Sequence, residues 1–242
     1  MTGIFITGTD TGIGKTAIAS GLAGAFKKRG YSVGVMKPVQ SGALVRNGKL
    51  YSQDAEFLMK ALDKHDEPEL VCPVLLREAL APGVAAEIEG KTVDLKHVKN
   101  AYLQLEKRHD LVIVEGAGGI AVPLRKRFLI SDLITCLGIP AIIVARAGLG
   151  TINHTVLTIE HAKLSGIRVI GTIINNYRGG RAEETNPKVI AEQTGLPILG
   201  IIPHDPTINV ESGITGNIMS LVEKNVDLEK IISCASVTWH HS

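Results

Sequence analysis

Residues 8–16, GTDTGIGKT, combine glycines with a final Lys-Thr pair, a combination suited to binding phosphate groups. In a phosphate-binding loop, backbone N–H groups and a lysine surround the phosphates, and the hydroxyl after the lysine ligates magnesium. Five residues rather than four separate Gly8 from Gly14, so an ordinary glycine turn is the alternative. The residues expected along the nucleotide are Gly12, Ile13, Gly14, Lys15, Thr16 and Ala17.

Two carboxylates are candidates for the acidic partner that such a loop needs. Glu115 ends the apolar run LVIVE, which places it at the ligand-binding edge of an open sheet. Gly116, Gly118 and Gly119 let the backbone approach a ligand closely, and Gly116, Ala117 and Gly118 are expected along the nucleotide. The alternative is a solvated acid at a strand end. Asp54 heads a predicted helix, so a ligand role and an N-terminal cap are both open.

Lys37 in the stretch KPVQSG is a second candidate cation. It leaves an apolar strand at the same edge as Lys15, so both ammonium groups are expected to converge on the phosphates. A second lysine suits an enzyme whose transition state carries additional negative charge. The alternative is a lysine that merely ends a strand.

Two further stretches follow predicted strands. In GLGTINHT, the free N–H groups of a helix start suit a carboxylate, although a plain capped helix is the alternative. In IINNY, the amides of Asn175 and Asn176 end a strand, and Asn175 offers a donor and an acceptor to the edge of adenine. This pattern favours ATP over GTP.

The elements that must position these residues alternate between short β-branched runs and stretches of helical period. Strands are predicted at 3–7, 32–37, 110–115, 140–145, 168–174 and 198–202, and helices at 15–29, 54–62, 95–107, 153–164, 185–194 and 216–233. Several strands are continuously apolar, which is typical of burial on both faces. The predicted fold is a single-domain α/β P-loop NTPase-like parallel sheet over residues 1–242, with helices on both faces and a functional loop at 39–52.

The composition limits the partners. The 26 basic and 24 acidic residues give a formal net charge of +2, so no strong field favours nucleic acid or a membrane surface. Three widely spaced cysteines form no Cys-x-x-Cys pair and fit a reducing compartment. We therefore expect a soluble cytoplasmic protein that binds neither nucleic acid nor membrane.

Together, GTDTGIGKT, KPVQSG, VEGAGG and GLGTINHT resemble the dethiobiotin synthetases of the biotin pathway, from residue 1 to about residue 216. The resemblance implies an ATP-dependent cyclo-ligase that converts 7,8-diaminopelargonic acid and carbon dioxide to dethiobiotin, ADP and phosphate. It also implies carbamate and carbamic-phosphoric anhydride intermediates, a Mg²⁺ cofactor and a homodimer.

The same resemblance implies the roles of individual residues. Thr16, Asp54 and Glu115 would hold magnesium, Lys15 and Lys37 would stabilise phosphoryl and carbamate oxygens, and Thr11 and Ser41 would touch the carbamate or the γ-phosphate. Substrate would lie against Ser41 and Gly118, with its carboxylate at Gly150, Thr151 and Asn153 of the partner subunit. Pro203, His204 and Asp205 would run beside the base. Gly83 stands where the family commonly has histidine, which removes an imidazole near the substrate.

Two other classes share parts of this pattern. Positioning ATPases of membranes or DNA have the same kind of loop, but Asp10 occupies the place of the lysine that reaches across their dimer. Amidating synthetases of the cobyrinic acid type also share the loop and the acidic strand end. They generally carry a glutamine-hydrolysing domain, for which 242 residues leave no room.

Overall fold

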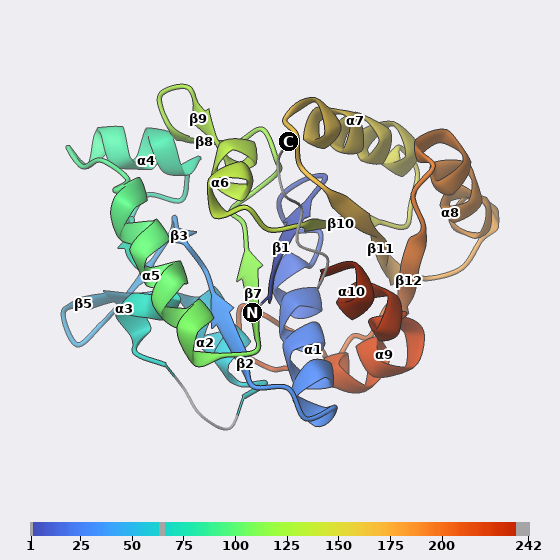
Figure 1. Ribbon diagram of the computed structural model, residues 1–242, viewed down its shortest axis with the longest axis horizontal. Coiled ribbons are helices and arrows are strands. Elements are labelled where there is room, and N and C mark those ends of the chain that lie inside the picture. Colours follow the sequence, from blue (N-terminus) through green and yellow to red (C-terminus); the bar gives the residue numbers. More distant parts are fainter. Residues whose placement is uncertain (1, 63–65, 236–242) are drawn as a thin grey trace.

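The computed structural model describes residues 2–62 and 66–235, and its centre is a six-stranded parallel sheet (Figure 1). The strand order is β12-β11-β10-β1-β7-β2, and every neighbouring pair is parallel. The strands are β1 (Thr2–Gly8), β2 (Val33–Met36), β7 (Leu111–Glu115), β10 (Ala141–Arg146), β11 (Val169–Tyr177) and β12 (Ile198–Pro203). All six predicted strands are present, and the predicted α/β class is confirmed. The extent of the domain over residues 1–242 stays a prediction, because residues 1, 63–65 and 236–242 lie outside the described ranges.

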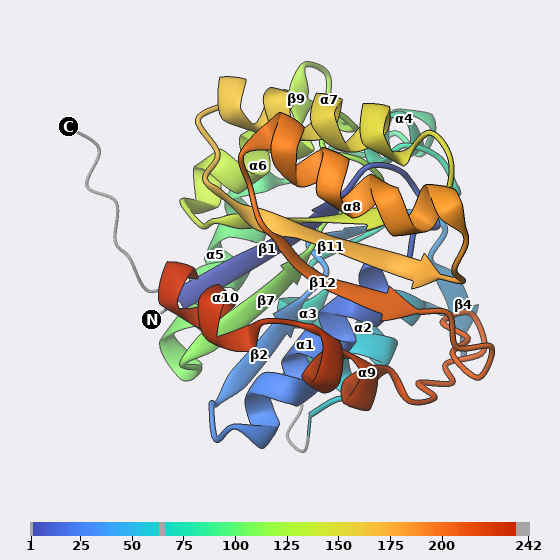
Figure 2. The ribbon, with the colours of Figure 1, turned by 90° about the vertical axis from the view of Figure 1, so that its right-hand side faces the viewer.

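Helices cover both faces of this sheet (Figure 2). One layer holds α1 (Lys15–Lys28), α2 (Gln53–Met59), α9 (Ile218–Asn225) and α10 (Leu228–Ala235), and the other holds α5 (Leu95–Arg108), α6 (Ile130–Leu137), α7 (Thr151–Leu164) and α8 (Arg181–Thr194). The short helix α3 (Pro68–Val71) packs against β2 and α5. In Figure 2 the strands run from left to right, so their carboxyl ends meet at one edge of the molecule.

Alternate residues of the central strands face the two layers. Ile4 and Ile6 of β1 pack in the cluster that contains α1 and α9, whereas Phe5 between them packs in the cluster that contains α5 and α6. All three side chains have no exposed surface. Because consecutive strand side chains point to opposite faces, a strand buried on both sides must be continuously apolar. The prediction from the apolar runs is therefore confirmed.

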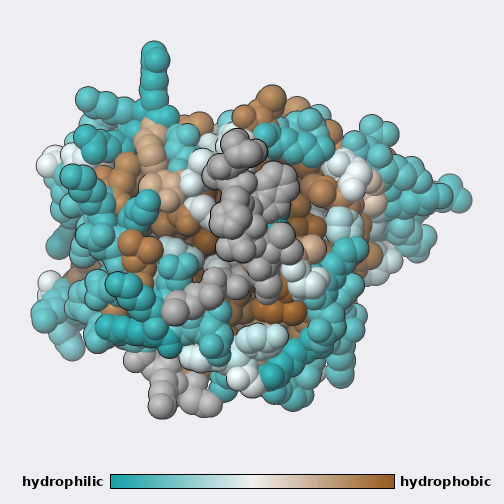
Figure 3. Space-filling model, viewed as in Figure 1, coloured by the Kyte–Doolittle hydropathy of each residue, from teal (hydrophilic) through white to brown (hydrophobic). Residues whose placement is uncertain are grey.

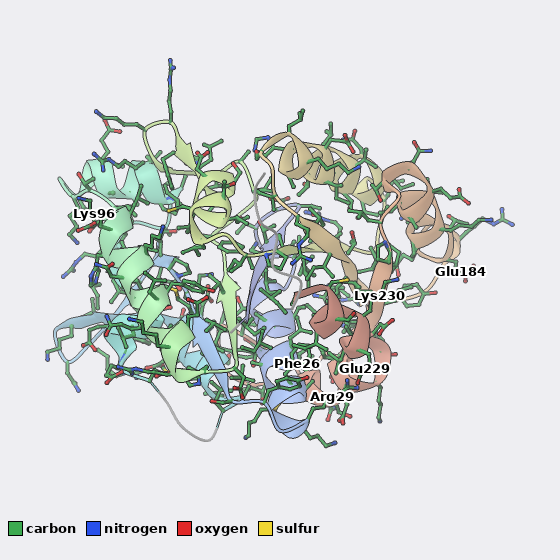
Figure 4. The ribbon with its side chains drawn as sticks, viewed as in Figure 1. Phe26, Arg29, Lys96, Glu184, Glu229 and Lys230 are labelled. Carbon is green, nitrogen blue, oxygen red and sulfur yellow. The ribbon has the colours of Figure 1, made fainter. Side chains whose placement is uncertain are left out.

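Helix α1 follows the phosphate loop and packs closely on α9. A Cβ atom on Gly21 would lie 2.5 Å from Val222, and one on Gly24 would lie 2.5 Å from the sulfur of Met219. These glycines therefore allow a helix approach that larger residues would prevent. At the end of α1, the guanidinium of Arg29 lies 2.6 Å from the Glu229 carboxylate of α10 (Figure 4).

The C-terminal helical region differs from the prediction of one helix at 216–233. The chain leaves the helical path at residues 226–227, where Val226 forms an antiparallel bridge with Gly200 and the Asp227 N–H donates to the Leu199 carbonyl over 2.8 Å. β12 is an edge strand with unpaired backbone groups, and this contact satisfies part of that edge. Tertiary pairing thus interrupts the helical period and separates α9 from α10.

The long segments between predicted elements also contain short structure. The expected functional loop at 39–52 begins with β3 (Val39–Gln40), which pairs with β6 (Val74–Leu75), and continues into a hairpin of β4 (Leu44–Arg46) and β5 (Lys49–Tyr51). Helix α4 (Pro82–Ile88) packs against the hairpin of β8 (Pro123–Arg125) and β9 (Phe128–Leu129). Strong period signals are absent from such short elements, so the sequence did not predict them.

Across the described ranges, no helix is long and apolar enough to cross a membrane. Figure 3 shows the face from which the strands start, where hydrophilic side chains occupy most of the periphery. The predicted catalytic residues lie at the opposite end of the strands, where the sheet presents its carboxyl edge.

Candidate active site

The phosphate loop connects β1 to α1 at the carboxyl edge of the sheet. Its last glycine, Gly14, precedes α1 with a φ of 92°, and no side chain caps the helix. A Cβ atom at this position would lie 2.1 Å from the Asn175 amide nitrogen, so only glycine fits. The first turn of α1 contains no acidic residue, and its free N–H groups are available to an anion.

A cavity of about 520 Å³ lies beside this loop. The predicted site residues that line it are Thr11, Gly12, Gly14, Lys15, Thr16, Lys37, Ser41, Asp54, Glu115, Ala117 and Gly118. These residues come from the segments that follow β1, β2, β3 and β7, from the last residue of β7, and from α1 and α2. The sheet topology thus brings the phosphate loop, both lysines and both carboxylates to one cavity.

Lys37 joins the two carboxylates. Its ammonium lies 2.7 Å from Asp54 Oδ2 and 2.8 Å from Glu115 Oε1, and its side chain is only 5% exposed. The Thr16 hydroxyl donates to Glu115 Oε1 over 2.8 Å. A buried charge requires paired partners of this kind, so Lys37 does more than end a strand.

This geometry also separates the two predictions for Asp54. The N-cap of α2 is Ser52, whose hydroxyl accepts the Ala55 N–H over 3.0 Å. The Asp54 carboxylate pairs with Lys37 and lines the cavity. Asp54 is therefore not the helix cap, and its charge belongs to the site.

The two lysines differ in proton affinity. Burial, the largest influence, lowers the pKa of Lys15 to about 8; the Glu115 carboxylate opposes this shift, and the Lys37 ammonium reinforces it. Burial by itself would lower the pKa of Lys37, but the Glu115 and Asp54 carboxylates raise it well above the usual value. Lys37 therefore stays charged at neutral pH, whereas the pKa of Lys15 lies only slightly above neutral pH.

The oxygen donors of the cavity fit a magnesium ion. Burial raises the pKa of Glu115, partly against the effect of Lys37, and its Oε2 atom is buried without a hydrogen-bond partner. An unpaired buried carboxylate oxygen beside the Thr16 hydroxyl and the Asp54 carboxylate is the donor chemistry that Mg²⁺ prefers. Lys37 also bridges the two carboxylates, and the described residues contain no cluster of three or more His, Cys, Asp or Glu side chains arranged for a metal.

Comparison with known proteins identifies the family. A family model described as an AAA domain matches residues 2–212. The ATP-dependent dethiobiotin synthetase BioD of Bacillus licheniformis is 44% identical over 235 residues, which cover 96% of this chain and 97% of that protein. The enzyme of the same name from Bacillus velezensis is 41% identical over 239 residues, with coverage of 96% and 97%. The chain belongs to the ATP-dependent dethiobiotin synthetase family. The resemblance read from the four motifs is confirmed.

A solved structure supports the fold of this dethiobiotin synthetase family member. The septum site-determining protein MinD of Pyrococcus horikoshii, complexed with Mg-ADP, matches with a TM-score of 0.61 over 97% of both chains. Its sequence identity is 19%, so the likeness shows the P-loop NTPase fold alone. MinD thus shares this architecture, whereas the two sequence relatives above are dethiobiotin synthetases.

Several residues predicted along the nucleotide do not line the cavity. The Ile13 carbonyl accepts the Asn175 amide N–H over 2.9 Å, and the Gly116 carbonyl accepts Lys37 over 3.3 Å. Ala17 is buried in the first turn of α1. Asn175 therefore holds the phosphate loop, and its carbonyl oxygen and second amide hydrogen are left for the predicted contact with adenine.

The residues predicted beside the base lie at the ends of β11 and β12. Asn176 Oδ1 lies 2.6 Å from His204 Nδ1, Asp205 accepts the Thr207 N–H over 2.8 Å, and Pro203 ends β12. None of these four residues lines the cavity, and their contacts with nucleotide stay predictions. Residues 208–211 further along the same loop do line it. The sequence did not predict a role for this segment. The only signal was the expectation that the loop after β12 runs beside the base.

Helix α7 begins much as α1 does. Its N-cap is Gly150, with a φ of 85°, no side-chain cap and no acidic residue in the first turn. Asn153 is exposed, whereas Thr151 is fully buried, with its hydroxyl 3.4 Å from that of Thr155. These three residues lie outside the described cavity of the same chain, and their predicted contact with substrate in a partner subunit stays a prediction.

Gly83 lies in α4, where the helix packs on β8. A Cβ atom there would lie 3.0 Å from the Pro123 carbonyl oxygen, which is tighter than an ordinary contact. A histidine at this position would therefore need the hairpin to move by a few tenths of an ångström. The close approach of α4 to β8 is the structural counterpart of this departure from the family pattern.

Proposed function

We propose that the protein converts 7,8-diaminopelargonic acid, carbon dioxide and ATP to dethiobiotin, ADP and phosphate. The family and the cavity support this reaction. In a first step, one amine attacks carbon dioxide, forms a C–N bond and releases a proton, giving a carbamate. A carbamate oxygen then attacks the γ-phosphorus and displaces ADP. Finally, the second amine attacks the carbamate carbon, phosphate leaves, and the cyclic urea closes.

Two lysines in one buried cavity are the observation that carries the proposal. Nucleotide binding alone needs one lysine, which Lys15 supplies at the phosphate loop. Lys37 adds a permanent positive charge between Asp54 and Glu115, at 2.7 and 2.8 Å. A fixed charge at the site of phosphoryl transfer stabilises oxygens that become more negative in the transition state.

The remaining polar residues orient the reactants. Thr11 and Ser41 line the cavity and offer hydroxyl groups to the carbamate or the γ-phosphate, and the backbone at Gly118 allows close approach of the substrate. Holding the carbamate in line with the γ-phosphate contributes about 7–11 kcal/mol to such a reaction.

We further propose that Thr16, Asp54 and Glu115 hold Mg²⁺, which supplies Lewis-acid polarisation of the phosphate oxygens when it is bound. The Thr16 hydroxyl and the unpaired Glu115 Oε2 support this assignment.

The substrate carboxylate is proposed to bind at the start of α7 in a partner subunit of a homodimer. Gly150 leaves the first N–H groups of α7 without a side-chain cap. Asn153, Leu157 and Leu164 follow each other along one helix face, since their spacings are four and seven residues. Leu157 and Leu164 are 61% and 88% exposed, and such apolar exposure favours a protein contact.

The test mixes the purified protein with MgATP, bicarbonate and the diamine, and follows dethiobiotin by mass spectrometry. Lys37→Met should abolish product, whereas Lys28→Met at an exposed position of α1 should not. ATP hydrolysis that needs no diamine, and responds to lipid or DNA, would contradict the proposal and favour a positioning ATPase. Cell fractionation tests the predicted cytoplasmic location separately. Recovery of the protein in the membrane fraction would contradict that prediction alone.

A further inference from the structure

Asp10 of the phosphate loop uses three acceptor atoms at once. Its Oδ1 accepts the Thr11 N–H, its Oδ2 accepts the Arg146 guanidinium, and its backbone carbonyl accepts the Lys15 ammonium, each over 2.7 Å. Thr11 and Lys15 line the cavity, whereas Asp10 and Arg146 do not. Asp10 therefore connects two cavity residues to a cation outside the cavity.

Arg146, which holds Asp10, lies next to the residue that holds the loop at a second point. It ends β10, where it is in register with Asn175 of β11. Asn175 in turn donates to the Ile13 carbonyl over 2.9 Å. Neighbouring strand ends thus hold the phosphate loop at Asp10 and at Ile13, so the loop's position follows the sheet.

The contact between Arg146 and Asp10 also has an electrostatic effect, because Asp10 is charged. A carboxylate beside an anion-binding loop opposes phosphate binding and competes for the cations that phosphate needs. The Lys15 ammonium donates to the backbone carbonyl of Asp10 over 2.7 Å, so these two charged residues are neighbours. In the structure the Asp10 carboxylate is directed to Arg146 instead.

We propose that Arg146 is a positioning residue for the phosphate loop, which holds and neutralises the Asp10 carboxylate so that Lys15 remains available to the nucleotide phosphates. This role goes beyond the proposed reaction, and it rests on the proposed function only in that the loop binds nucleotide. It predicts opposite effects of the two partners. Loss of Arg146 leaves an unbalanced carboxylate, whereas loss of the Asp10 charge leaves an additional cation.

The experiment measures MgADP affinity by calorimetry at low and physiological salt. Arg146→Gln should weaken binding about fivefold at low salt, and less at higher salt because solvent ions screen the charge. Arg146→Lys and the double variant D10N/R146Q should both return to within about twofold of the parent protein, since the first keeps the pair and the second removes both charges. Asp10→Asn alone should bind at least as tightly as the parent.

A matched control is the exposed pair of Lys28 and Glu223, whose charged atoms lie 2.8 Å apart on α1 and α9. Its double glutamine variant K28Q/E223Q should leave MgADP affinity unchanged. Equal weakening by Arg146→Gln and Asp10→Asn would indicate a purely mechanical contact and overturn the proposal, as would unchanged affinity in Arg146→Gln. If Arg146→Gln does not fold, weaker binding by Asp10→Asn overturns it by itself. A parent protein that binds no MgADP would instead refute the proposed function.

Discussion

Replacing Lys37 by methionine tests the central charge arrangement of the site. Methionine keeps most of the volume of the side chain and removes its charge. Lys37 is 5% exposed and bridges Asp54 and Glu115, which are 23% and 1% exposed. The variant therefore leaves Glu115 as an almost fully buried carboxylate without its cation.

The magnitude follows from this burial. Breaking a buried ion pair by removing one partner costs about 3–5 kcal/mol of the free energy of unfolding. Burial already raises the pKa of Glu115, and without Lys37 that pKa rises further. A carboxyl group with a raised pKa binds more protons in the folded state, so the stability of the variant should recover as pH falls through the folded pKa.

The assay is urea unfolding followed by circular dichroism at pH 5 and pH 8, together with turnover to dethiobiotin. Lys37→Met should lose about 3–5 kcal/mol at pH 8 and clearly less at pH 5. The double variant K37M/E115Q should regain at least half of that loss because the buried charge is gone, yet both variants should be inactive. The exposed control Lys28→Met should stay within about 1 kcal/mol of the parent.

Two results would refute this reasoning. Equal stability of Lys37→Met and the parent at both pH values would mean that the pair does not compensate the burial of Glu115. Turnover by the stable double variant would mean that the charge of Lys37 is not needed for the chemistry.

Three further predictions concern the loop and the proposed interface. Because the pKa of Lys15 is about 8, MgADP affinity measured by calorimetry should fall about tenfold between pH 7 and pH 9 as the ammonium loses its proton. Lys15→Arg, which stays charged, should make the affinity nearly independent of pH in this range. An equally steep fall in the variant would contradict the prediction. Gly14→Ala should lose about 1–3 kcal/mol in urea unfolding, together with nucleotide binding, since its Cβ would meet Asn175 at 2.1 Å. Leu157→Glu should shift a dimer to a monomer in light scattering, whereas Leu103→Glu on α5 should not; equal masses for both variants would argue against α7 as the interface.

Local features of the sequence predicted much of the architecture. A strand, a glycine turn and a helix that begins with Lys-Thr are contiguous, so residues 2–28 contain the information for the phosphate loop. Short β-branched runs likewise predicted the six strands, and several of these runs are continuously apolar because burial on both faces leaves no alternation. Short elements such as α4 and the β8–β9 hairpin have too few residues to produce a period.

The pairing of charges was settled only by the tertiary structure. Lys37 and Glu115 lie 78 residues apart and Thr16 and Glu115 lie 99 apart, and the register of β1, β2 and β7 brings them together. The sequence left Asp54 open between a cap and a site residue, and the contact with Lys37 decided it. The break between α9 and α10 depends in the same way on the edge of β12. The sequence by itself determined which residues are suited to phosphate chemistry. Strand order and register determined which of these residues meet, because contacts between distant segments are set by the sheet and not by local preference.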